Sequence, residues 1–170
     1  MKLSYLIKAE GTYPNYLLNN YIIRDLCLDG NKRKYHGNLL CLHNINEPVA
    51  IENIYFSNCK GTCFHLKGAC WNLYFKNLIL RNSGDNPDTG SQDKPCIVLE
   101  SDSNTRQHPS DLWFYSLYFE QNFGTSIKTV YNPPTFDNKA ASSIHIIGGK
   151  LEHSPKKQLS TKVPAVYVDS

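Results

Sequence analysis

Residues 73–80 read Leu-Tyr-Phe-Lys-Asn-Leu-Ile-Leu, and the pattern in this short stretch decides the fold. Apolar residues alternate with other residues on both sides of Asn77, but the alternation slips by one position at the asparagine. Alternation of this kind is typical of a strand with one buried face, and the slip indicates a bend. Asn, Asp and Gly tolerate the left-handed backbone that a sharp bend requires. The stretch therefore predicts two short strands joined by a bend.

The same pattern recurs five times, and each copy is followed by a third short apolar run. The fifth copy is weaker, because Gly149 replaces an apolar residue. The smallest spacing between copies is 24 residues, from Val49 to Leu73, so the minimal repeat is one coil of three strands and the remainder is loop insertion. The copies start at Tyr21, Val49, Leu73, Leu112 and Ile144, and the third runs cover 40–42, 64–66, 97–99, 127–129 and 166–168.

A three-strand coil with asparagine at one bend resembles the right-handed parallel β-helix of the pectate-lyase-like superfamily, which includes phage tailspikes and polysaccharide-degrading enzymes. The resemblance covers residues 21–170, and Asn53 with Asn77 is similar to that family's asparagine ladder. Segments 22–31 and 119–127 are similar to segments common in such phage proteins. The resemblance implies an all-β solenoid of about five coils that recognises a polysaccharide, on a virion tail or outside the cell. The alternative fold is an antiparallel β-sandwich, but the chain has no Asn-Gly hairpin signal.

The two ends bound the expected domain. Residues 1–20 form an incomplete coil or lead-in, and residues 21–170 form the β-helix domain. The last apolar run has no polar cap, although solenoid ends need capping because their strand edges are otherwise unpaired. We therefore expect the chain to be part of a longer one, or to be capped by a partner subunit. Three long loops, 29–39, 81–96 and 152–165, are predicted to wall a groove along one edge.

Stacked coils lie about 4.8 Å apart, so equivalent positions should become neighbours. Glu120 and Glu152 would then bring two carboxyl groups to about 5 Å, near the separation in a retaining glycosidase. Arg81 on the other side would keep one of them ionised. This pair predicts glycoside hydrolysis, with one glutamate as acid and the other as nucleophile or base. The alternative is a surface salt bridge between Arg81 and Glu120 with Glu152 solvated. The full column is Asp29, Ser57, Arg81, Glu120 and Glu152.

Glu100 and Asp102 are the second candidate pair. Two positions apart on one strand face, their α-carbons would be about 6.6 Å apart, which suits an inverting hydrolase. The alternative is that Asp102 already lies in the turn after the strand. His65 and Lys67 would point outward from the preceding coil. The loop after the third copy adds acidic groups that could bind sugar hydroxyls or Ca²⁺, although an ordinary surface turn has the same composition. These acidic groups are Asp85, Asp88 and Asp93.

Two outward columns carry aromatic residues. Tyr74 and Trp113 are predicted to bind substrate by stacking on sugar rings, and subunit packing is the alternative. Tyr55, Ile79 and Tyr118 favour packing, either in a homotrimer or against another part of the chain. The alternative function is therefore a non-catalytic structural or adhesin segment that trimerises and displays its loops.

Composition excludes several functions. The 170 residues include 19% charged residues with a net charge of +3, and the short basic runs at 32–34 and 156–157 lack interleaved aromatics, which disfavours nucleic-acid binding. No apolar run approaches the roughly 20 residues of a membrane span. Of six cysteines, five lie in or beside apolar patterns, which favours free buried thiols. Cys59 to His65 is nearest to a zinc motif but lacks a second pair, so no metal site is predicted. Signatures of uronate lyases are absent, which makes a lyase less favoured than a hydrolase. The signatures of polygalacturonases are absent as well.

Overall fold

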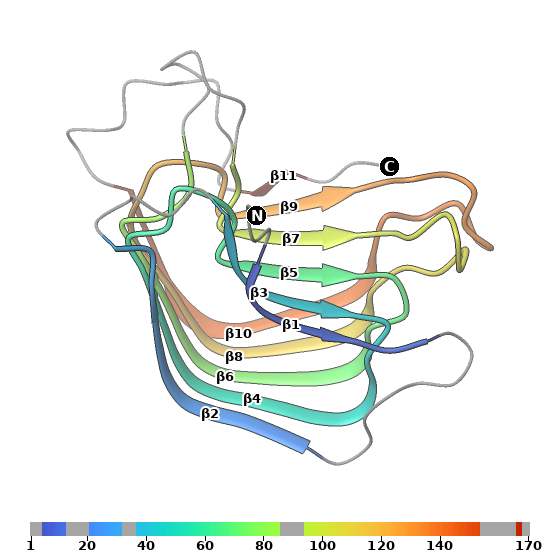
Figure 1. The fold of residues 1–170 in the computed structure, drawn as a ribbon, viewed down its shortest axis with the longest axis horizontal. Coiled ribbons are helices and arrows are strands. Elements are labelled where there is room, and N and C mark those ends of the chain that lie inside the picture. Colours follow the sequence, from blue (N-terminus) through green and yellow to red (C-terminus); the bar gives the residue numbers. More distant parts are fainter. Residues whose placement is uncertain (1–4, 13–20, 32–36, 86–93, 154–165, 168–170) are drawn as a thin grey trace.

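The computed structural model describes residues 5–12, 21–31, 37–85, 94–153 and 166–167. They form an all-β solenoid with two parallel sheets (Figure 1). Each described strand pairs with the strand two places away in the chain, so one coil contributes one strand to each sheet. The six-stranded sheet contains β1 (Tyr5–Glu10), β3 (Asn38–His43), β5 (Phe64–Lys67), β7 (Ile97–Glu100), β9 (Ile127–Val130) and β11 (Val166–Tyr167). The five-stranded sheet contains β2 (Tyr21–Asp29), β4 (Asn46–Ser57), β6 (Trp71–Arg81), β8 (Ser110–Asn122) and β10 (Ser142–His153).

Two of the three strands predicted for each coil are one continuous, bent strand. β6 pairs with β8 on both sides of Asn77, from Trp71 to Arg81. Asn77 has a φ of 53°, in the left-handed region, as predicted for the bend. Because every stacked copy turns at the same level, the ladder bends as a unit and is not interrupted. The bend is confirmed, whereas the prediction of three strands per coil is wrong, since each coil has two.

The asparagine ladder at this bend is confirmed. The Asn77 amide donates a hydrogen bond of 3.0 Å to Oδ1 of Asn53, and the Asn53 amide donates one of 2.9 Å to Oδ1 of Asp25. These residues have φ angles between 53° and 58°. The ladder therefore supplies both the backbone conformation and the side-chain contacts that hold successive bends in line.

Left-handed residues recur every five positions along the long strands. In β6 they are Asn72 and Asn77, and Asn82 follows directly after the strand. Asp111, Ser116 and Gln121 repeat this spacing in the next coil. Each long strand thus turns at regular positions five residues apart. Of these turns, the central bend was the only one predicted from the sequence.

The interior is filled by the inward columns predicted from the alternation. The rings of Phe75 and Phe114 stack with centroids 4.5 Å apart, and Phe64 meets Phe75 edge-on at 5.3 Å. All three are at most 1% exposed. The short strands lie where third strands were predicted and pair in the expected register, with Phe64 beside Ile97 and Ile97 beside Ile127. Five cysteines are buried as free thiols and Cys27 is exposed, which agrees with their predicted place in the apolar pattern.

The predicted long loops fall largely outside the described residues. The structure does not describe 32–36, 86–93 or 154–165, so the predicted groove walls are not placed, and Asp88 and Asp93 lie in the second of these ranges. β1, within the predicted lead-in, pairs in parallel with β3 and forms one edge of its sheet.

Candidate functional site

The predicted column on the outer face of the five-stranded sheet is present. Ser57 pairs with Arg81, Arg81 with Glu120, and Glu120 with Glu152, while Asp29 precedes Ser57. We call these five residues the outer polar column. Their neighbours along each strand, such as Phe56 and Leu80, are fully buried, so the column faces away from the core.

A polar pocket of about 390 Å³ opens at one end of the outer polar column. Carboxylate, hydroxyl, carboxamide, guanidinium and phenol groups line it together with one thiol. The lining residues are Cys27, Asp29, Tyr55, Ser57, Asn58, Arg81, Asn82 and Gln121.

Hydrogen bonds hold the polar side chains of this pocket in a row. The Ser57 hydroxyl and the Asn58 amide donate to Oδ2 of Asp29 at 2.5 and 2.8 Å. The Asn82 amide donates to Oδ1 of Asn58 at 2.6 Å, which makes a second ladder one level beyond the asparagine bend. Asn58 and Asn82 both have backbone φ angles in the left-handed region. The left-handed turns that bend the coil therefore also place two side-chain amides at the pocket.

The predicted acid pair lies at the other end of the column. The Arg81 guanidinium is 3.9 Å from the Glu120 carboxylate, and a hydrogen bond with Tyr55 raises the pKa of Arg81. Glu152 forms a close ion pair with Lys150, and this contact lowers the pKa of Glu152. Glu152 is therefore held ionised, and Glu120 lies beside the Arg81 guanidinium, so each member of the pair has a cationic neighbour.

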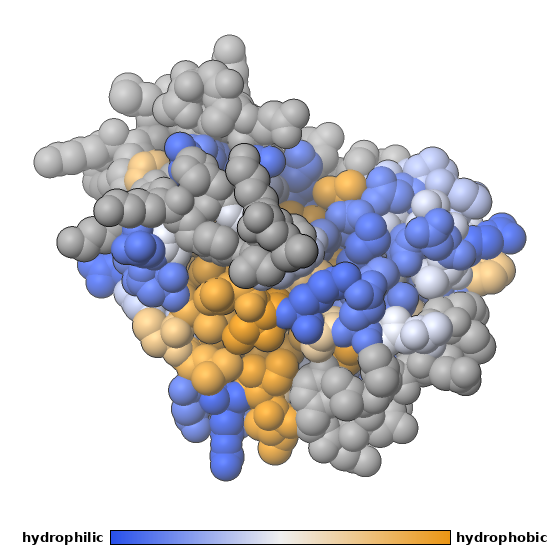
Figure 2. Space-filling view, in the orientation of Figure 1, coloured by the Kyte–Doolittle hydropathy of each residue, from blue (hydrophilic) through white to orange (hydrophobic). Residues whose placement is uncertain are grey.

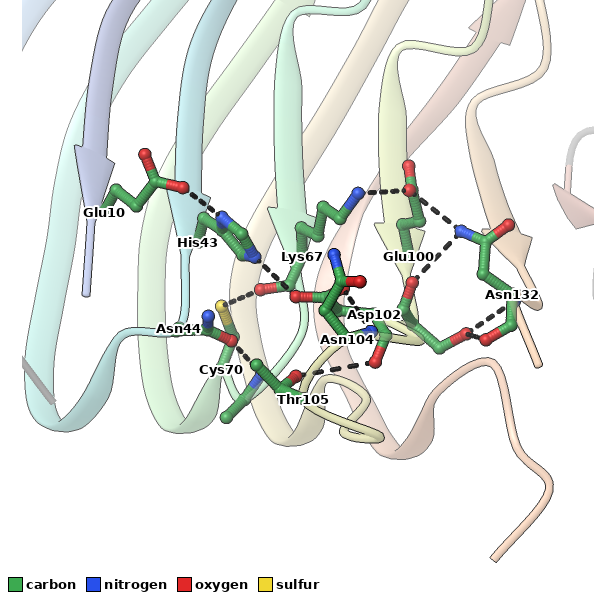
Figure 3. A network of polar contacts seen from close by, with 12 residues as sticks. Glu10, His43, Asn44, Lys67, Cys70, Glu100, Asp102, Asn104, Thr105 and Asn132 are labelled. Atoms are coloured by element: carbon green, nitrogen blue, oxygen red, sulfur yellow. Dashed lines mark hydrogen bonds and ion pairs between the residues drawn. The ribbon is translucent and has the colours of Figure 1, made fainter. Parts of the chain in front are cut away.

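The second candidate pair belongs to a network across the ends of the short strands (Figure 3). His43 Nε2 lies 2.9 Å from the Asp102 carboxylate, and His43 Nδ1 lies 2.7 Å from the Glu10 carboxylate. A neutral imidazole has one donor and one acceptor, so two carboxylates on one ring need a second proton on the ring or one on a carboxyl group. His43 thus ties the edge strand β1 to the turn that contains Asp102.

Glu100 is held by three neighbours in the same network. Lys67 Nζ and the Asn132 amide lie 2.9 Å from Oε1 of Glu100. His65 Nε2 lies 2.9 Å from Oε2 without the direction of a hydrogen bond, and Nδ1 of the same ring contacts the Tyr5 hydroxyl at 3.0 Å. Burial raises the pKa of Glu100, but contacts with His65 and Lys67 outweigh it and bring the pKa to about 2. Glu100 is therefore a poor general acid.

Glu100 and Asp102 do not share a strand face, and the alternative, with Asp102 in the turn, is the one observed. β7 ends at Glu100, and Asp102 lies in the following turn, where it forms an antiparallel bridge with Gln107. Asp102 is 3% exposed and its carboxylate faces His43. Both carboxylates thus hold strands and turns together, and they lie on the opposite sheet from the polar pocket.

The outward aromatic residues are neighbours, as predicted. Tyr74 pairs with Trp113, and Ile79 lies between Tyr55 and Tyr118. The indole of Trp113 stacks on the His145 ring at 3.9 Å between centroids, so one of its faces is already covered. Tyr74 remains 46% exposed.

Of the acidic loop residues predicted to bind sugar hydroxyls or Ca²⁺, Asp85 lies within the described residues. Asp85 is 8% exposed, and its backbone pairs with Lys94. Within the described ranges no group of three His, Cys, Asp or Glu side chains is placed to hold a metal ion. No helix in the described part of the chain is long and apolar enough to span a membrane.

Several residues of both clusters were not predicted from the sequence. Asn58 and Asn82 follow Asn53 and Asn77 by five positions, and this spacing was a readable signal. Glu10 and His43 gave no local signal, because their contact depends on the pairing of β1 with β3.

Fold and site together define a parallel β-solenoid with stacked asparagine hydrogen bonds and a polar pocket on its outer face. In comparisons with known proteins, no family model, no curated protein and no solved structure matched the chain.

Proposed function

We propose that this solenoid binds a polysaccharide on its outer polar column. The observation that carries the proposal is the lining of the pocket between Asp29 and Arg81. Pockets for ordinary small molecules are mostly apolar with a few polar groups. Here donors and acceptors dominate and repeat at the spacing of stacked strands, about 4.8 Å, which suits a chain of hydroxyl-bearing units.

The parallel coils and the asparagine ladder also support a relationship to right-handed β-helices of the pectate-lyase-like superfamily. Tailspikes and depolymerases of that class recognise glycans, and the proposal extends this property to the present chain. The handedness of the coil and membership of the superfamily are parts of the proposal.

Hydrolysis at Glu120 and Glu152 is a second candidate activity. Register pairing places the two residues on adjacent strands, at a spacing close to that of the carboxyl groups in a retaining glycosidase. One glutamate would be the acid and the other the nucleophile, and the ion pair with Lys150 favours Glu152 as the nucleophile. Incubation with capsular and cell-wall glycans should then release reducing ends, and Glu120→Gln should abolish release while binding is retained.

Binding itself is tested by titrating neutral and acidic oligosaccharides by calorimetry. Arg81→Met removes the charged donors of the pocket but keeps the length of the side chain, and we expect affinity to fall about tenfold or more. Lys76→Met is the matched control, because Lys76 is an exposed cation on the same strand outside the pocket lining. Equal affinity of the Arg81 variant and the wild type would refute the pocket as the binding site.

The alternative is a scaffold that trimerises through Tyr55, Ile79 and Tyr118. Their register supports it, since the three side chains form one outward column. Tyr55 also lines the pocket, so a trimer interface there would compete with glycan. A trimer in sedimentation, together with absence of glycan binding, would favour the scaffold.

A further inference from the structure

Within the described residues, the first and last strands of each sheet have a neighbouring strand on one side only. β1 and β2 form one end, and β10 and β11 form the other. An edge strand presents a row of unpaired N–H and C=O groups, which is a template for another strand. The two ends therefore offer the same pair of edges, one long and bent and one short.

The β10 end exposes side chains whose equivalents are buried in the three internal long strands, β4, β6 and β8. Ile146 pairs with Phe114 and Leu151 with Phe119 on inward columns. The two phenylalanines are 1% exposed, whereas Ile146 is 49% and Leu151 53% exposed. A pocket of about 340 Å³ opens here, and its lining includes Leu117, Phe119 and Ile127. The interior of the solenoid is thus accessible at this end.

The β2 end presents matching apolar residues. Ile23 and Leu26 are only partly buried, while their neighbours in β4, Ile51 and Ile54, are at most 1% exposed. Figure 2 shows an apolar patch at this end of the molecule, in the region that Figure 1 assigns to β1 and β2.

We propose that the β10 end of one copy binds the β2 end of a second copy, head to tail. In this polarity both ladders continue as parallel sheets, and the left-handed Gly148 of one copy meets the left-handed Asp25 of the next. Ile146 then continues into the column of Ile23, and Ile144 into the column of Tyr21, as each coil continues into its neighbour. Turning one copy over would place a long bent strand antiparallel to its partner and lose the alignment of the bends.

The outer polar column provides a test of the register between the two copies. In the continued column Asp29 of the second copy follows Glu152 of the first, so two carboxylates become neighbours, with Lys150 two residues away. Like charges at this spacing oppose association. Replacing Glu152 with lysine should therefore strengthen association, an effect that a contact elsewhere on the molecule would not produce.

Sedimentation velocity over a range of protein concentrations tests the proposal on the full chain. We expect the wild type to form assemblies that grow with concentration. Leu151→Arg should weaken self-association at least about tenfold, because it puts a charge where a leucine would be buried. Ile147→Arg is the matched control, since Ile147 is 48% exposed on the same strand but lies in the outward column beside Tyr115.

A mixing experiment fixes the polarity. The Leu151→Arg variant keeps a competent β2 end, so a small amount added to wild type should cap assemblies and reduce their mean size. Ile23→Arg blocks the other end, and circular dichroism checks its fold. Each variant alone should be monomeric, and their mixture should yield dimers only. A monomeric wild type, unaltered association of Leu151→Arg, or self-association of Ile23→Arg equal to that of wild type would overturn the proposal.

Discussion

Substitutions at Asn77 separate the backbone and side-chain contributions of the central bend. The Asn77 amide donates one hydrogen bond of 3.0 Å to Asn53, and such a bond contributes about 0.5–1.5 kcal/mol. The φ of Asn77 is 53°, where an ordinary residue with a β-carbon pays about 1–2 kcal/mol. Glycine avoids that strain but loses about 0.5–1 kcal/mol through its freedom in the unfolded chain. Asn77→Gly should therefore lower the free energy of unfolding by about 1–2.5 kcal/mol, and Asn77→Ala by about 1.5–3.5 kcal/mol, with alanine the more destabilising because the hydrogen-bond term is common to both.

The order of the two variants is the informative result. In an ordinary strand position glycine is the less stable of the two, so Lys76→Ala and Lys76→Gly serve as controls and should show the opposite order. Urea unfolding followed by far-ultraviolet circular dichroism and by tryptophan fluorescence measures all four variants. Coincident transitions from the two probes are required, because repeat proteins can unfold in steps. If alanine is as stable as glycine at position 77, the left-handed bend does not carry the assigned strain.

Three further predictions follow from the core, the polar network and the aromatic stack. Phe75→Ala should lower the free energy of unfolding by about 3–5 kcal/mol in urea, whereas Tyr74→Ala, at an exposed neighbouring position, should change it by less than about 1 kcal/mol. The pKa of Glu100 is lowered to about 2 in the folded chain, so its contribution, on the order of 3 kcal/mol, is complete above the ordinary value of 4.5 and disappears as pH falls toward 2. Glu100→Gln should flatten the pH dependence of stability in this range, and an unaltered profile would contradict the assignment. In a Trp71→Phe background, His145→Ala should shift the fluorescence of Trp113 to longer wavelength because the indole loses its stacking partner, and an unshifted spectrum would argue against the stack.

The stacking of equivalent positions could be predicted because it depends on local patterns that repeat. Asn53 and Asn77 are 24 residues apart, yet their contact follows from two copies of one pattern and a coil of matching length. The number of strands was mispredicted for a physical reason. A single left-handed residue changes the phase of burial just as a break between two strands does, and alternation alone cannot distinguish them.

The site could be predicted only where it follows the repeat. Arg81, Glu120 and Glu152 lie on equivalent positions of the long strands, so the register made them neighbours. The contact between His43 and Asp102 depends on where the turn after β7 folds back, and no repeat encodes that. The same turn chemistry decides whether a carboxylate such as that of Asp102 faces solvent or an imidazole.

Packing and the proposed glycan binding depend on different faces of the same strand. Inward positions such as Phe75 are buried in the internal coils, so their identity is constrained by packing, and the left-handed positions are constrained by the backbone. Outward positions such as Arg81 meet neither constraint, so their chemistry can vary without loss of the coil. The same division between inward and outward positions holds in each stacked strand. An outward polar residue therefore extends a polar column whenever the residues paired with it on the adjacent strands are also polar. The polar pocket therefore needs no special loop, since two turns that the solenoid requires anyway place Asn58 and Asn82 there.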